Sequence, residues 1–112
     1  MEAANPEGFT ANLEVEDRRA MVQLTGEMDL STGPVLRRLF VSALDFAPAT
    51  ISVDLGDVTF LDAAGVSALL SAASLAGERG CEVTIHRAAP AVVRVLRLLD
   101  VHDRLPIERT QA

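Results

Sequence analysis

The chain has 112 residues, 49% of them hydrophobic and 23% charged, and its formal net charge is −6. This length suits one domain with a modest core, and the apolar fraction excludes a disordered chain. The acidic balance argues against a nucleic-acid-binding protein, which needs a basic surface to offset phosphates.

Missing residue types exclude further classes of site. All ten basic residues are arginines, so a P-loop lysine, a Schiff-base lysine and a lysine general base are excluded. The single cysteine, Cys81, precedes an expected strand and is predicted to be a small buried residue. His86 and His102 lie far apart and have no visible partners, so we expect both at the surface. The sequence therefore predicts neither a metal site nor a cofactor.

Hydropathy and the chain ends predict a cytoplasmic protein. No apolar run reaches the roughly 18 residues that a membrane span needs, and the first residues lack a basic, apolar signal region. We expect a single domain over 1–112 with its core at about 9–107, and flexible ends at 1–8 and 108–112.

A hairpin and a helix are predicted first. Apolar and polar residues alternate over 9–16 and 20–25, as on half-buried strands. A helix is expected to begin at Ser31 or Thr32, with Pro34 in the first turn, where proline is tolerated. Its inner face is predicted to comprise Leu36, Leu39, Phe40 and Ala43, and its outer face Arg37 and Arg38.

The centre of the chain predicts a strand followed by a helix. Apolar and polar residues alternate over 51–55, and a short loop is expected at 56–57. Phe60 and Leu61 are apolar enough to be buried, and Asp62 is placed to cap the next helix.

The helix after Asp62 is predicted to have two contrasting faces. The buried face should comprise Val66, Leu69, Leu70 and Ala73, and the exposed face Ala63, Ser67, Ser71, Ser74 and Glu78. We expect Ala63, Ala64 and Gly65 to present a bare first turn, with unpaired N–H groups, to solvent. Such a turn is a docking surface or an anion site, but an ordinary capped helix start explains it equally well.

A strand and a helix complete the predicted fold. The strand covers 82–86 with Val83 and Ile85 inward, a helix opens at Pro90, and an extended return follows at 105–107. The inner face of that helix should comprise Val92, Val93, Leu96 and Leu99. The order ββαβαβα predicts an α/β fold: a mixed four-stranded sheet, made of an N-terminal hairpin and parallel crossovers, with three or four helices mainly on one face.

Two segments resemble the STAS family, which comprises bacterial anti-sigma factor antagonists and the cytoplasmic domains of sulfate transporters. They are G-E-M-D-L at 26–30 and V-D-L-G-D-V-T-F-L-D-A-A-G-V at 53–66, within a resemblance that extends from Phe9 to Leu105. The resemblance implies a stand-alone bacterial STAS domain that is not an enzyme. Its partner would be an anti-sigma factor of the serine-kinase type, whose sigma factor it releases in a partner switch that regulates transcription.

The same resemblance implies where the partner binds. In such antagonists the residue directly after the motif's aspartate is the phosphoacceptor, and this chain has Ala63 there, which has no hydroxyl. The implied partner-binding residues are Glu27, Asp29, Ser31, Thr32, Asp62, Ala63, Ala64, Gly65 and Ser67.

These residues also have structural interpretations. Gly65 costs about 1 kcal/mol relative to alanine in a helix, which is accepted for internal packing or, as we favour, for close approach by a partner. Glu27 and Asp29 should lie at the same end of the sheet as Asp62, where they either contact a kinase or form a solvated loop. Ser67 is the hydroxyl nearest to Ala63, and ordinary helix surface explains it better than a substitute phosphosite does.

Two alternative functions stay open. One is a STAS subunit of a transport or sensory assembly, which would use the same surface permanently. The other is a nucleotide-binding STAS domain, which is disfavoured because the chain has neither a phosphate-cradling glycine loop nor a lysine.

Overall fold

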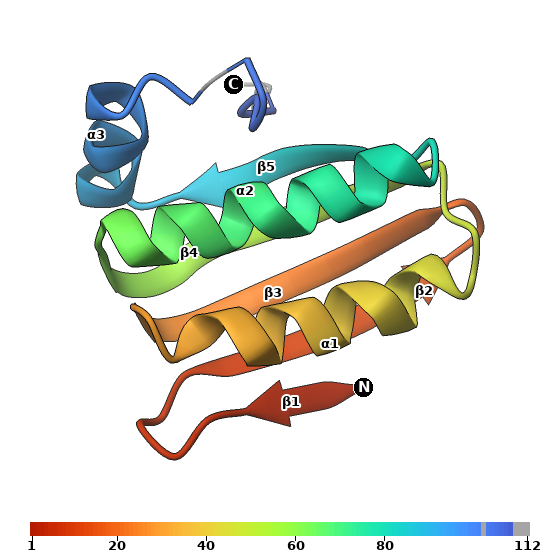
Figure 1. Ribbon diagram of the computed structural model, residues 1–112, viewed down its shortest axis with the longest axis horizontal. Helices are drawn as coiled ribbons and strands as arrows, with labels where there is room; N and C mark the ends of the chain where they lie inside the picture. The colour runs from red at the N-terminus through yellow and green to blue at the C-terminus, as the bar shows by residue number, and fades with distance from the viewer. Residues whose placement is uncertain (102, 109–112) are drawn as a thin grey trace.

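A mixed sheet with helices packed against it forms the framework of the structure (Figure 1). The computed structural model describes residues 1–101 and 103–108, which contain five strands and three helices. The strands are β1 (Glu2–Ala4), β2 (Thr10–Glu16), β3 (Arg19–Met28), β4 (Thr50–Leu61) and β5 (Glu82–Ala88). The helices are α1 (Thr32–Leu44), α2 (Ala63–Glu78) and α3 (Pro90–Leu98). None of the described helices is long and apolar enough to cross a membrane.

The strands lie side by side in chain order, β1-β2-β3-β4-β5. β1, β2 and β3 pair antiparallel, whereas β3, β4 and β5 pair parallel. Each parallel step needs a crossover connection, which α1 and α2 provide. The predicted α/β class and mixed sheet are confirmed. The predicted count of four strands is wrong, because Glu2–Ala4 pairs with β2 within the segment expected to be a flexible end.

Helices α1 and α2 cover one face of the sheet and run side by side in front of it in Figure 1. The strand residues beneath them are fully buried, among them Val22, Ile51, Val53 and Ile85. The predicted inner face of α1, made of Leu36, Leu39, Phe40 and Ala43, is buried as expected. Burying these side chains is the main driving force for the fold.

Helix α2 packs through a different stripe from the one predicted. Val66 and Leu69 are buried, but Leu70 and Ala73 are only half-buried. Ala72 and Ala76 are buried instead, because they continue the row of Leu69 and, being small, let α2 approach its neighbours closely. The predicted exposed face is confirmed: it comprises Ala63, Ser67, Ser71, Ser74 and Glu78.

Helix α3 lies beside the carboxyl end of β5, where the chain leaves the sheet (Figure 1). Val92 and Leu96 are buried as predicted, and Val93 is half-buried. Leu99, predicted to face the core, is 44% exposed because α3 ends at Leu98, so Leu99 no longer follows the helical stripe.

Strand β4 continues through the loop expected at 56–57 and ends only at Leu61. Its pairing with β3 has two register shifts, each of which places an extra residue on β4. Leu61 is buried as predicted, but Phe60 is 49% exposed. The prediction of a buried Phe60 is wrong, because the second bulge pairs Phe60 with the exposed Glu27 rather than with a core residue.

Candidate functional site

The candidate site lies at the carboxyl edge, which we define as the edge of the sheet where β3, β4 and β5 end and α1, α2 and α3 begin (Figure 1). Met28 pairs with Leu61, so β3 and β4 end at the same level and their two following turns are neighbours. Glu27 and Asp29 therefore lie at the same end of the sheet as Asp62, as predicted. In open α/β sheets, binding sites concentrate at such an edge.

The turn from β4 into α2 is held by Asp62. Its Oδ1 accepts a hydrogen bond of 2.9 Å from the backbone N–H of Gly65, while its backbone is extended at φ −106°, ψ −177°. These are the properties of a helix N-cap, so the predicted cap is confirmed. The N–H of Asp62 also donates to the carbonyl of Met28 at 3.3 Å, which ties this turn to the end of β3.

Gly65 provides the close contact between α2 and β3. A Cβ atom at this position would lie 2.4 Å from the backbone oxygen of Met28 and 2.8 Å from Cδ1 of Leu61. Only glycine fits there. Gly65 is buried, so the expectation that it faces solvent for a partner's approach is wrong, and internal packing explains the residue. Of the first turn, Ala63 is exposed and Ala64 is half-buried.

The turn from β3 into α1 is fixed by side-chain hydrogen bonds. Oδ1 of Asp29 accepts from the backbone N–H of Ser31 at 2.9 Å and from its hydroxyl at 2.7 Å. These bonds lower the pKa of Asp29. Oγ1 of Thr32 accepts from the N–H of Asp29 at 3.0 Å, and Asn5 donates to the Ser31 hydroxyl at 2.8 Å. Helix α1 begins at Thr32, within the predicted choice of Ser31 or Thr32.

Exposure sorts the predicted partner-binding residues by what they can contact. The exposed ones are Glu27, Ala63 and Ser67. The half-buried ones are Asp29, Ser31, Asp62 and Ala64, and the buried ones are Thr32 and Gly65. The side chain of Thr32 is therefore out of a partner's reach, because it serves the turn into α1. The surface open to contact is centred on Ala63 and its neighbours.

Two apolar residues at this edge are exposed, although the sequence does not predict their exposure. Leu30 is 83% exposed in the turn after β3, and Phe60 is 49% exposed near the end of β4. Leu30 follows Asp29 directly, outside any strand or helix periodicity that would bury it. The lack of such a periodicity is the one feature of the sequence that could have identified Leu30 as exposed. For Phe60 the signal is hidden, since its exposure depends on a bulge that leaves no mark in the local pattern.

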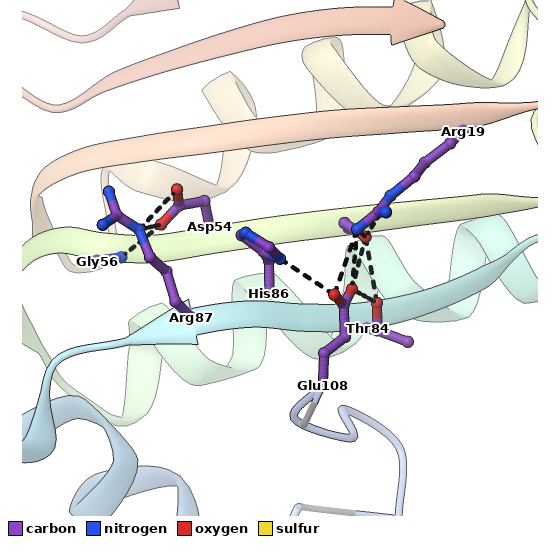
Figure 2. A network of polar contacts seen from close by, with 8 residues as sticks. Arg19, Asp54, Gly56, Thr84, His86, Arg87 and Glu108 are labelled. Atoms are coloured by element: carbon purple, nitrogen blue, oxygen red, sulfur yellow. Dashed lines mark hydrogen bonds and ion pairs between the residues drawn. The ribbon is translucent and has the colours of Figure 1, made fainter. Parts of the chain in front are cut away.

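The face of the sheet opposite α1 and α2, which we call the open face, carries a polar cluster around Glu108 (Figure 2). The Glu108 carboxylate accepts hydrogen bonds from Ser52 at 2.6 Å and from Thr84, and Nδ1 of His86 lies 3.1 Å from it. Arg19 donates to it at 3.3 Å and also to the Ser52 hydroxyl at 2.7 Å. The cluster thus joins β3, β4 and β5 to the end of the described chain.

Hydrogen bonding dominates the electrostatics of Glu108. Partial burial alone would raise the pKa of its carboxyl, but the bonds from Ser52, Thr84 and His86, together with the charge of Arg19, lower the pKa to about 2. His86 therefore has a partner, contrary to prediction. His102 lies outside the described residues. Glu108, which the sequence assigned to a flexible end, is instead the centre of the cluster.

The Glu108 cluster lacks the arrangement of a hydrolytic triad. In such a triad a serine donates to a histidine, which a carboxylate then orients. Here Ser52 and His86 both contact the carboxylate directly, so the serine donates to Glu108 and not to the histidine. Within residues 1–101 and 103–108, no three His, Cys, Asp or Glu side chains gather closely enough to hold a metal ion.

A second ion pair lies on the same face, closer to the carboxyl edge (Figure 2). Nε of Arg87 donates to both oxygens of Asp54 at 2.8 and 2.9 Å, and this pairing raises the pKa of Arg87. Asp54 also accepts from the N–H of Gly56 at 2.8 Å. A Cβ at Gly56 would lie 2.6 Å from Nε of Arg87, so this glycine makes room for the pair.

Comparison with known proteins identifies the family and the fold. Residues 11–107 match the family model described as "Mlab, STAS domain". Comparison with curated protein sequences gives no match. A crystal structure of an anti-sigma factor antagonist from Mycobacterium paratuberculosis is similar at a TM-score of 0.74 and 27% identity, covering 96% of this chain and 92% of that one.

Two structures of SpoIIAA share the fold. The anti-sigma factor antagonist SpoIIAA in its unphosphorylated form matches with a TM-score of 0.66 and 19% identity, over 91% of this chain and 89% of that one. The Bacillus cell fate determinant SpoIIAA in its phosphorylated form matches with the same TM-score and identity, over 88% of this chain and 91% of that one. The resemblance to the STAS family is confirmed by the family model that matches residues 11–107.

Proposed function

The chain belongs to the STAS domain family, and on this premise we propose that it is an anti-sigma factor antagonist. It binds an anti-sigma factor of the serine-kinase type through the turns that follow β3 and β4 at the carboxyl edge, and thereby releases the sigma factor. The observation that carries this proposal is the exposed Ala63 at the start of a capped helix, with the exposed Ser67 one turn along the helix and the exposed Glu27 at the same end of the sheet. Likeness to the Mycobacterium antagonist, at 27% identity, supports it.

The geometry of the edge suits binding by a preformed surface. Asp62 and Gly65 fix the start of α2 against Met28, and Asp29 fixes the turn before α1. A surface held in this way loses little conformational freedom when a partner docks, so more of the contact energy contributes to affinity. Competition between this surface and the sigma factor for one anti-sigma factor then drives the release.

Ala63 makes this antagonist insensitive to the kinase of its partner. A phosphoryl group adds about 1.5 to 2 negative charges at pH 7, which at an interface causes repulsion and desolvation. Alanine has no hydroxyl to accept that group, so the docking surface stays permanently competent. Incubation with the kinase and ATP should leave the intact mass of the protein unchanged. A single phosphoryl group mapped to Ser67 would instead place the switch one turn further along α2.

The proposal is tested by putting a carboxylate where the phosphoryl group would stand. Ala63→Glu should weaken binding to the purified anti-sigma factor at least tenfold, because burying an unpaired charge costs several kcal/mol and the helix dipole returns only about 0.3–1 kcal/mol. Ala63→Ser should bind like the wild type until it is phosphorylated. Calorimetric titration measures the affinities, and melting curves check that the exposed position leaves the fold stable.

A matched control separates docking from a general effect of charge at a helix start. Ala91 is also exposed and lies in the first turn of α3. Ala91→Glu should leave the affinity unchanged. If Ala63→Glu binds as tightly as the wild type, the partner docks elsewhere. If the partner recovered from cells is a transport or sensory component rather than an anti-sigma factor, the same surface serves an assembly of that kind.

A further inference from the structure

Leu30 and Phe60 expose large apolar side chains at neighbouring strand ends of the carboxyl edge. Leu30 is 83% exposed and Phe60 is 49% exposed. Phe60 pairs with Glu27 across β3 and β4, and Leu30 lies two residues beyond Met28, which pairs with Leu61. Single exposed apolar residues are common on protein surfaces, so their placement and surroundings must decide whether they have a role.

Both side chains are presented by a fixed backbone. Leu30 lies between Asp29 and Ser31, whose hydrogen bonds of 2.9 and 2.7 Å hold the turn. Phe60 lies between the register shift of β4 and the buried Leu61, so the strand continues on both sides of the exposed ring. Apolar groups held in this way act as anchors at low entropic cost, because little motion is lost when a partner covers them.

The surroundings of these two residues are acidic. Glu27, Asp29 and Asp62 carry carboxylates at this edge, and within 1–101 and 103–108 the structure shows no ion pair for any of them. The arginine of β5, Arg87, is already engaged by Asp54 at 2.8 Å. The edge therefore combines exposed apolar side chains with three carboxylates for which the described residues show no ion pair.

We infer that Leu30 and Phe60 are the anchors of the docking surface and that the partner presents an apolar socket bordered by arginine or lysine. The inference rests on the proposed function and specifies the chemistry of the partner at that same site. Interfaces concentrate binding energy in a few desolvated apolar or aromatic side chains, with charges at the rim. The acidic rim around Glu27 speeds the approach of a basic surface and disfavours an acidic one.

The chain offers matched controls for both anchors. Phe46 is 62% exposed after the end of α1, and Leu98 is 78% exposed at the end of α3. Binding to the purified anti-sigma factor is titrated with Leu30→Ala and Phe60→Ala, beside Leu98→Ala and Phe46→Ala. Each anchor variant should lose at least tenfold in affinity, and each control variant should lose less than twofold. All four should melt like the wild type, since each removes an exposed side chain.

The charged rim is tested by salt dependence. Glu27→Gln should slow association at low ionic strength, and the difference from the wild type should shrink at high salt, where exposed charges are screened. Glu14→Gln, at an exposed position on β2, is the control and should leave the association rate unchanged. If Glu27→Gln associates as fast as the wild type at low salt, the inference that basic residues border the partner's socket is overturned.

Photo-crosslinking separates this inference from the proposed function. A photoreactive phenylalanine is placed at 30, 60, 46 or 98 in cells that carry the native partners, and adducts are identified by mass spectrometry. Adducts with an anti-sigma factor at 30 and 60, absent at 46 and 98, together with the affinity losses, support both. If Ala63→Glu weakens binding but the anchor variants do not, the proposed function stands and the anchors are overturned.

The remaining outcomes are also decisive. Suppose that no anti-sigma factor binds, but 30 and 60 crosslink to another protein whose purified form binds Leu30→Ala at least tenfold more weakly than the wild type. The anchors then stand and the proposed function is overturned. If no anti-sigma factor binds and 30 and 60 yield no more adduct than 46 and 98, both are overturned.

Discussion

The carboxyl edge and the open face of the sheet treat their polar groups in opposite ways. On the open face, Glu108 accepts hydrogen bonds from side chains on neighbouring strands, so its carboxylate is satisfied within the molecule (Figure 2). At the edge, the bonds of Asp62 and Asp29 satisfy only the turns beneath them, while Leu30 and Phe60 stay exposed. A polar network whose groups bond to one another indicates a structural role. A rigid surface with exposed apolar groups marks a place that a partner can cover.

The open-face network has a structural role, which explains why so many hydrogen bonds meet at Glu108. The N–H of Ile85 donates to the carbonyl of Pro106 at 2.8 Å, and the N–H of Glu108 donates to the carbonyl of Ile85 at 2.7 Å. These bonds place 106–108 along the edge of β5, and the Glu108 side chain then reaches across to β4 and β3. The network thus covers an edge strand that would otherwise expose unpaired backbone groups.

The largest effect that would break this comparison is expected at Gly65. Gly65→Ala should destabilise the fold by about 3 kcal/mol, because a Cβ that would lie 2.4 Å from the Met28 carbonyl oxygen forces α2 away from β3. Gly77→Ala is the control on the same helix, where a Cβ would meet nothing within 4 Å. That variant should gain about 0.5–1 kcal/mol from helix propensity. Denaturant unfolding measures both, and equal stabilities would mean that α2 is not clamped to β3.

The second largest effect on stability is expected at Glu108, and it tests the open-face side of the comparison. Its pKa of about 2 lies below its ordinary value of 4.5, so its contribution to stability is complete above pH 4.5 and is lost as the pH falls toward 2. Glu108→Gln should therefore lower the free energy of unfolding by about 2 kcal/mol at pH 7, allowing for partial exposure. The difference from the wild type should shrink steadily below pH 4.5.

Denaturant unfolding at pH 7, 4 and 3 measures this effect. Glu82→Gln is the control, because Glu82 is exposed on β5 and forms no ion pair within the part of the chain that the structure describes. It should change stability by less than about 0.5 kcal/mol. A deficit in Glu108→Gln that stays constant across this pH range would mean that the charge of Glu108 contributes nothing.

The sequence predicts those parts of the fold that depend on local chemistry. Alternation identified four of the strands, and the row from Leu36 to Ala43 identified the inner face of α1. Asp62 is predictable as a cap because a carboxylate directly before an apolar helical stripe has a local function. In the same way, the small exposed residue Ala63 followed directly from its position in the helix.

The errors share a physical cause, which is dependence on neighbours distant in the chain. β1 has only three residues, too few for alternation, and exists because β2 offers an open edge. Gly65 is explained by the carbonyl of Met28, and Phe60 by a bulge against β3. Arg19 and Glu108 meet across 89 residues, with no local signal at either end. Pattern reading detects which residues are special more readily than it detects what they contact.

The smallest expected effect separates the two roles open to Asp62. Asp62→Ala removes the acceptor of the 2.9 Å bond from Gly65 and should lower stability by about 1 kcal/mol. Asp62→Asn keeps a side-chain oxygen for the cap, so its stability should stay within about 0.5 kcal/mol of the wild type, since asparagine and aspartate cap about equally well. Titration with the anti-sigma factor then isolates the charge. If the rim attracts a basic partner, Asp62→Asn should bind several-fold more weakly at low salt despite its intact fold. If Asp62→Asn binds like the wild type at every salt concentration, Asp62 is a cap alone, and the negative charge that matters at this edge belongs to Glu27 and Asp29.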